Sequence, residues 1–308
     1  MTTEGSTPSR NKKRPGSTTV ARPKKQASPV PLPEAAAGIA RPAPILELEE
    51  RAEAGDDIAA CKLGDHYRTG DIVSQDWGMA FSWYSRGAAL GNAEAQNNLG
   101  TLFLDSLGCA RDPAQAIHWY RKSAEQGLAI AQYNLAKRYY GGDGIDQDYA
   151  EARKWFEKAS VQGEAWASCE LGTMHRFGQG VPRNLLAAAE FHLIAAEAGD
   201  DVAILGNIAE YHAELEEMAL SGSQLASWFL SRIYSRGFGV DKSQPMTWAW
   251  ISCAKKYGSS DVYPDTAEEV AEAYAFYHMS ITSENRKEGQ KRLKDMRAAH
   301  NRRLRKQP

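Results

Sequence analysis

The sequence lacks the long apolar stretches that mark membrane proteins and secreted precursors. A membrane-spanning helix needs about 20 consecutive, mostly apolar residues, and no such run occurs among the 308 residues. Residues 1–44 contain a basic cluster but lack the apolar centre of a signal peptide behind it. We therefore expect a chain without a transmembrane segment that is located in the cytoplasm.

Cysteine is scarce, and common catalytic motifs are missing. The four cysteines, Cys61, Cys109, Cys169 and Cys253, lie far apart without a CxxC pair, which argues against a disulfide framework and against a zinc site. The motifs HExxH, GxSxG, GxxxxGKS and GxxxxGKT are also absent. We expect no enzyme, no cofactor and no metal.

Aromatic residues are scarce in residues 1–44, which hold 8 of the 13 prolines and many basic side chains. Such a composition cannot offset the entropy lost on ordering, so it predicts a disordered, basic, Pro-rich tail. Residues 1–45 carry a net charge of +6 and residues 285–308 one of +8, which leaves −16 for residues 46–284. The basic tails are candidates for contact with nucleic acid or an anionic membrane surface; the alternative is a solvated tail that folds onto the acidic middle.

Glycines at a constant spacing divide the middle of the chain into repeats. They lie 36 residues apart in two series, from Gly55 to Gly199 and from Gly222 to Gly258. Such a period indicates an array of small structural units. Between the two series lies an irregular segment at 200–221. The five full units start at Gly55, Gly91, Gly127, Gly163 and Gly222.

The first half of each unit has the pattern of an amphipathic helix. Counted from the starting glycine, position +4 is always Ala, +8 is always Leu, and +12 is aromatic or His. Residues at i, i+4 and i+8 share one stripe of a helix. Position +9 is small, which would let a neighbouring helix approach closely. The residues at +9 are Gly64, Gly100, Ala136, Gly172 and Ser231.

The second half of each unit predicts another helix, with bulky residues at +28 and +29. Glycine-rich connections precede it, where glycine takes the positive φ that ends a helix. Each unit is thus a helical hairpin, which must stack on its neighbours to bury its apolar face. We expect the four tryptophans at +28 to form core, and His175 and His192 to be core histidines rather than metal ligands. The +28 row is Trp83, Trp119, Trp155, Phe191 and Trp250; the +29 row is Tyr84, Tyr120, Phe156, His192 and Ile251.

The residues outside the full units predict caps on the array. Leu48 and Ala52 lie 7 and 3 residues before Gly55, as Tyr84 and Ala88 do before Gly91. This spacing indicates a lone second helix at the start of the array. Two further helical patterns cover residues 265–280 and 283–301. The predicted organisation is a tail over 1–44, a repeat array over 45–258, C-terminal capping helices over 259–301 and a basic tail over 302–308.

The pattern Ala-x3-Leu-Gly-x2-Tyr, then Gly-x-Gly-Val, then Ala-x2-Trp-Tyr, then Ala before Gly, resembles the Sel1-like repeat, a relative of the tetratricopeptide repeat. The resemblance covers about residues 55–258. It implies an all-α fold, a right-handed α-α superhelix (solenoid) of helical hairpins, and a non-catalytic adaptor function in signalling, regulation or complex assembly. Some cysteine-rich members are described as penicillin-binding hydrolases. That activity is a remote alternative, because this chain lacks the cysteine pair in each repeat.

By the same resemblance, the first helices line a concave groove that positions +6, +10 and +13 face. Spacings of four and three residues place these positions on one stripe of each helix. Their Tyr, Trp, Arg and Asn side chains suit recognition of a peptide or domain of another protein. An ordinary solvated helix face is the alternative. The candidate binding residues are Asn97, Tyr133, Lys137, Tyr140, Arg176, Trp228 and Arg232.

Overall fold

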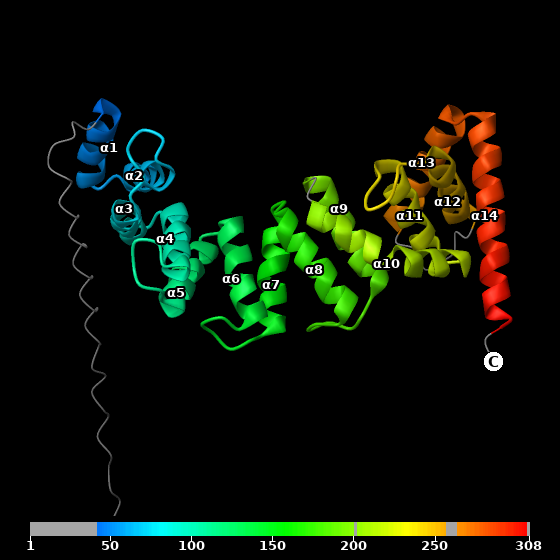
Figure 1. The fold of residues 1–308 in the computed structure, drawn as a ribbon, viewed down its shortest axis with the longest axis horizontal. Coiled ribbons are helices and arrows are strands. Elements are labelled where there is room, and N and C mark those ends of the chain that lie inside the picture. Colours follow the sequence, from blue (N-terminus) through cyan, green and yellow to red (C-terminus); the bar gives the residue numbers. More distant parts are fainter. Residues whose placement is uncertain (1–41, 200–201, 257–263, 307–308) are drawn as a thin grey trace, which may run out of the picture.

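The computed structural model describes residues 42–199, 202–256 and 264–306. Within these ranges the chain is all-α without a strand, and consecutive helices pack as hairpins, as the sequence predicts. They follow one another along the longest axis from α1 (Ala43–Glu53) at one end to α14 (Ser283–Leu304) at the other (Figure 1). None of the described helices is both long and apolar enough to cross a membrane. The predicted disorder of the N-terminal tail lies outside the described residues.

Five hairpins correspond to the five units, each pairing a first helix with a second helix. Before them, α1 occupies the place of the predicted lone second helix. After them come α13 (Pro264–Ser280) and α14, and α14 extends to Leu304, beyond the predicted end at 301. The hairpins are α2 (Asp57–Thr69) with α3 (Trp77–Leu90), α4 (Ala93–Asp105) with α5 (Pro113–Glu125), α6 (Ala129–Gly141) with α7 (Tyr149–Val161), α8 (Ala165–Phe177) with α9 (Leu185–Ala198), and α11 (Gln224–Arg236) with α12 (Gln244–Lys256).

The constant glycine spacing has a backbone cause. The starting glycine of each unit joins the second helix of one unit to the first helix of the next, and its φ lies between +89° and +106°. Residues with a side chain rarely adopt this left-handed conformation, so glycine is favoured at each joint. Gly199, where the period breaks, instead has an extended backbone with φ at −162°.

The second helix of every unit begins at a capping residue, position +21, which no apolar pattern marks in the sequence. The backbone N–H of this residue donates to the carbonyl oxygen of residue +12 over 2.8 to 3.0 Å, which closes the connection between the two helices. Its side-chain oxygen accepts a hydrogen bond from the first turn of the second helix. The caps are Asp76, Asp112, Asp148, Asn184 and Ser243.

The small residues at +9 allow a close approach within each hairpin, as predicted. A Cβ atom built on Gly64 would lie 2.5 Å from the ring of Tyr84, and one on Gly172 would lie 2.5 Å from the ring of His192. The +29 side chains therefore occupy the space that the missing side chains leave. All five +29 residues are buried.

The tryptophan row at +28 is buried only near the ends of the array, which corrects the prediction that all of it forms core. Trp83 and Trp250 are buried. Adjacent helical positions point about 100° apart, so +28 and +29 cannot both point straight at the first helix. In the third unit the Nζ atom of Lys158 covers the outer face of Trp155, 3.8 Å from the ring centroid. Three members are only half-buried: Trp119, Trp155 and Phe191.

One long helix, α10 (Val202–Leu220), takes the place of a hairpin in the irregular segment. Tyr211 follows Gly199 by 12 residues, as in a first helix, whereas Leu215 and Ala219 precede Gly222 by 7 and 3 residues, as in a second helix. All three side chains are buried. A single helix thus supplies packing positions of both halves of a unit, which lets the array continue although this unit is 13 residues short.

Filling the space above Gly64 should separate the helices of the first hairpin. We expect Gly64→Val to lower the free energy of unfolding by about 1 to 3 kcal/mol or more, because the added side chain overlaps Tyr84. Gly141→Ala is the matched control, since a Cβ there meets nothing within 4 Å. Urea denaturation should show the control to be as stable as the parent, or up to about 1 kcal/mol more stable. Equal stability of both variants would contradict the close approach.

The junction between α9 and α10 should make the fold sensitive to acid. His192 is stacked on Tyr211, with ring centroids 5.6 Å apart, and its Nδ1 atom lies 3.0 Å from the Tyr211 hydroxyl. Burial lowers the pKa of His192 to about 4. As the pH falls from about 6.5 to 4, the unfolded chain binds a proton that the folded chain does not, so stability decreases across this window.

His192→Phe should remove this contribution, roughly 2 to 3 kcal/mol between pH 7 and pH 4.5. The measurement is urea denaturation at both pH values, with His278→Gln, at an exposed position, as the control. The same loss of stability in the parent and in His192→Phe would contradict the assignment.

Candidate functional site

A cavity of about 710 Å³ lies across the first helices of the first three units. Ile58 and Cys61 of α2 line one part of it, and Leu128 and Ala129 at the beginning of α6 line another. The start of α4, the residues that join α5 to α6 and Gln162 at the end of α7 complete the lining. Because three successive first helices share one cavity, the hollow lies on the face of the array where the groove is predicted.

An exposed apolar row borders this face. Ile58, Ile130 and Trp166 occupy position +3 of the first, third and fourth units, and their exposed fractions are 54%, 39% and 39%. Position +3 lies one helical turn before +6 and +7, so it shares their side of the helix. The row lies outside the +6, +10 and +13 positions predicted to face the groove, although the shared +3 position of its members is visible in the sequence. Glu94 holds the same position in the second unit.

Two of the predicted groove residues connect successive first helices. The Nδ2 atom of Asn134 in α6 donates a hydrogen bond to Oδ1 of Asn97 in α4 over 2.9 Å. The Nζ atom of Lys137 in α6 lies 2.6 Å from Oε1 of Glu170 in α8. Asn97 is buried and Lys137 is half-buried. Their polar groups therefore already have partners in neighbouring units.

The two predicted tyrosines of α6 also contact other parts of the array. The Tyr133 ring centroid lies 5.8 Å from that of Phe156, and burial raises the pKa of Tyr133 to about 12. The Tyr140 hydroxyl donates a hydrogen bond to Oε1 of Gln179 over 2.6 Å. Both side chains are half-buried. Tyr133 thus packs within the third unit, whereas Tyr140 joins the third unit to the fourth, and each leaves only part of its surface open.

The two predicted arginines also pair with side chains of neighbouring helices. Arg176 of α8 pairs with Glu210 of α10 and lies over the ring of Tyr211, 5.6 Å from its centroid. Arg232 of α11 pairs with Glu197 of α9 over 2.6 Å. Surface ion pairs contribute little free energy each, about 0 to 1 kcal/mol. Their repetition along one face fixes how each first helix sits against the helices of the neighbouring units.

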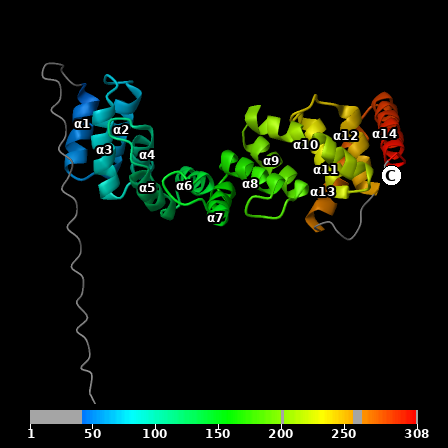
Figure 2. The same cartoon turned by 60° about the horizontal axis from the view of Figure 1, so that its bottom comes forward.

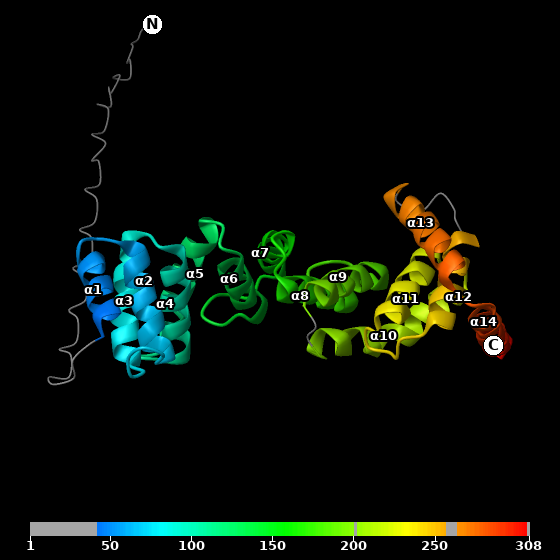
Figure 3. The ribbon, with the colours of Figure 1, turned by 90° about the horizontal axis from the view of Figure 1, so that it is seen from above.

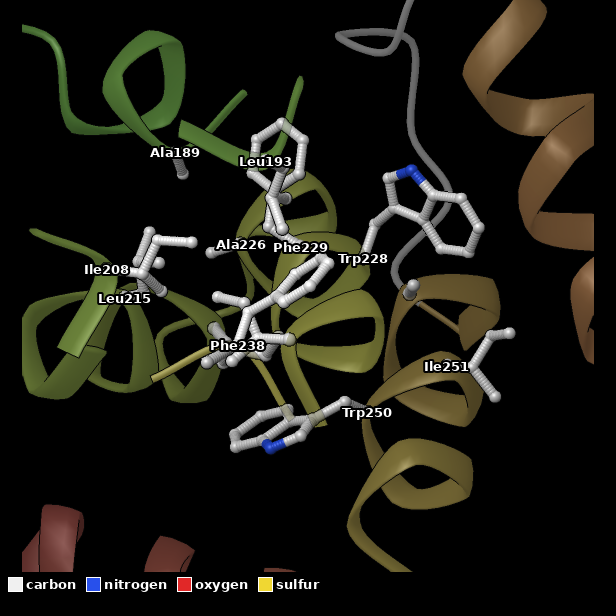
Figure 4. Close-up of a cluster of buried hydrophobic side chains, with 14 of the residues drawn as sticks. Ala189, Leu193, Ile208, Leu215, Ala226, Trp228, Phe229, Phe238, Trp250 and Ile251 are labelled. Atoms are coloured by element: carbon white, nitrogen blue, oxygen red, sulfur yellow. The ribbon is translucent and has the colours of Figure 1, made fainter. Parts of the chain in front are cut away.

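Trp228 and Arg232 share a second, smaller cavity of about 310 Å³ with Ser235, Ile251 and Tyr277. Trp228 is buried in the same core cluster as Ile208, Leu215 and Phe238, and Figure 4 shows its ring on the opposite side of that cluster from Ile208 and Leu215. Ile251 stands at +29, where the other units have Tyr, Phe or His. The smaller aliphatic side chain leaves space beside α11.

The seven predicted residues do not form one continuous site. They lie on α4, α6, α8 and α11, and α6 and α11 are far apart along the array (Figure 2). The three residues of α6 lie on one helix, with Nζ of Lys137 5.8 Å from the Tyr140 ring centroid. The two residues of α11 belong to the smaller cavity.

The family model of the Sel1 repeat matches the sequence at residues 57–92, 93–128, 129–164, 167–200 and 224–259. A solved protective antigen of uropathogenic Escherichia coli strains, which displays an SLR fold, is 28% identical over 75% of this chain with a TM-score of 0.53. The aligned part is 56% of the antigen, so the chain spans little more than half of that protein's length. A Sel1 repeat protein from Oxalobacter formigenes is 25% identical, covers 70% of this chain and 100% of its own, and has a TM-score of 0.50. No curated protein matches the sequence. With five matched repeats over more than half of its length, the chain belongs to the Sel1 repeat family.

Proposed function

We propose that the array is a non-catalytic adaptor that binds a segment of another protein across the first helices α2, α4, α6 and α8. The exposed apolar row of Ile58, Ile130 and Trp166 is the observation on which the proposal rests. Large apolar side chains exposed at the same position of three units form a surface that gains free energy when a partner covers it.

The neighbouring cavity supports the same proposal. It offers a hollow beside Ile58 with polar groups at its rim, among them Lys62, Asp65 and Glu94. An apolar centre with a polar rim is the usual composition of a protein-binding surface. The inter-unit contacts of Lys137 and Arg176 keep this face in a preformed shape, which lowers the entropy lost on binding.

The adaptor is proposed to act in signalling, regulation or complex assembly, in the cytoplasm. All four cysteines are free thiols in the structure, which suits a reducing compartment. The partner is proposed to contribute apolar side chains to the row, because Ile130 and Trp166 offer it no charge to pair with.

Site-specific photo-crosslinking in living cells tests the groove directly. A benzophenone amino acid placed at Trp166 should form a covalent adduct with the partner, identified by mass spectrometry. The same amino acid at Lys154, whose side chain is 57% exposed on the second helix α7, is the matched control and should form none.

A second change distinguishes binding by the apolar row from accidental proximity. Ile130→Glu in the chain with the crosslinker at position 166 should abolish the adduct, because a charge then faces the partner's apolar side chains. The melting temperature should stay unchanged, since position 130 is exposed in the first turn of α6, where an acidic residue is favourable. Equal adducts at 166 and 154, or an adduct that persists in Ile130→Glu, would contradict the proposal.

A further inference from the structure

The last helix, α14, has two opposite faces of different character. At about 100° per residue, Gly289, Leu293 and Met296 lie on the side that faces the array. A Cβ atom on Gly289 would lie 2.2 Å from the carbonyl oxygen of Pro245, so α14 packs directly on the start of α12. Leu293 is buried beside it. The helix is therefore held in a fixed orientation.

The opposite side of α14 carries a row of cations, which we call the basic face. Its members lie within roughly 80° of arc and extend over about 27 Å of the helix axis. All of them are exposed. Within residues 42–199, 202–256 and 264–306, none of them forms an ion pair with a carboxylate. The basic face consists of Lys287, Lys291, Lys294, Arg302 and Arg305.

The other arginines of α14 are used within the protein. Arg292 pairs with Glu288, and Arg303 lies 3.4 Å from Glu217 of α10. Arg297 donates a hydrogen bond to the sulfur of Cys253 over 3.2 Å. The helix thus separates its cations into those that join it to the array or to its own acidic residues and those that point to solvent.

We propose that the basic face of α14 binds the phosphate backbone of double-stranded DNA. A duplex carries one negative charge for about every 1.7 Å of its axis, so a straight row of five cations meets several phosphates at once. The row consists of lysine and arginine without an aromatic side chain. Single strands usually need aromatic side chains on which bases stack, and a membrane surface favours apolar side chains that enter the interface.

The charge of the array between the two basic ends disfavours contact with DNA along its length. Residues 46–284 carry −16 and repel a polyanion. Figure 3 shows α14 at the extreme end of the array, beyond α12. DNA can therefore approach the basic face without meeting the acidic units. Binding through charges alone is independent of base sequence.

Fluorescence anisotropy with the full-length chain and a labelled 20-base-pair DNA duplex tests the proposal across a range of salt concentrations. Each phosphate contact contributes about 0.9 to the slope of log affinity against log salt concentration. The triple change Lys287→Gln, Lys291→Gln and Lys294→Gln should therefore weaken binding and reduce this slope by about 2.7. The matched control, Lys122→Gln with Lys154→Gln and Lys242→Gln, removes the same charge elsewhere and should leave the slope unchanged.

Three further measurements can overturn the assignment. A chain without residues 1–41 should keep its DNA affinity, so loss of binding there and not in the α14 variant would assign the contact to the N-terminal basic segment. Tighter binding to a single strand, to an RNA duplex or to vesicles with anionic lipid than to duplex DNA would contradict the chosen partner. Absence of salt-dependent DNA binding by the parent chain would refute the proposal outright, and leaves the crosslinking test of the groove unaffected.

Discussion

In three of the five hairpins the side chain at +29 rests on a glycine at +9, and this contact sets the distance between the two helices on which the packing of the array depends. Where +9 is glycine, a ring from the second helix lies directly on the first helix, as Tyr84 does on Gly64. This contact turns one face of the first helix toward the core. The opposite face of the same helix is left to meet its counterparts in neighbouring units and any partner.

That opposite face combines two functions on different rows. The residues at +6, +10 and +13 form contacts between units, as Lys137 does with Glu170 and Asn97 with Asn134. At position +3, by contrast, Ile58, Ile130 and Trp166 expose large apolar side chains. The polar rows thus determine the shape of the surface, and the apolar row offers it to another molecule.

The sequence predicts the fold well because each unit repeats the same local physics. The glycine spacing, the apolar stripes and the small residues at +9 all follow from backbone and packing requirements that five units display together. The site is predicted less well, because a helical wheel gives the direction of a side chain but not its partner. Nothing in the sequence pairs Arg176 with Glu210, since they belong to different units and the second lies in the irregular segment. Likewise, the sequence does not show that Trp155 is only half-buried, with the Nζ atom of Lys158 over its ring.

Helix α10 makes one joint of the array different from the joints between regular hairpins. Toward α9 it presents Tyr211, and at its other end Leu215 and Ala219 stand where a second helix precedes a new unit. Regular units can in principle be gained or lost by duplication without disturbing their neighbours, because every joint is alike. The joint between α9 and α10 is unlike the others, because Gly199 has an extended backbone where the other joints have a glycine with positive φ, so a unit inserted there would meet a different packing surface.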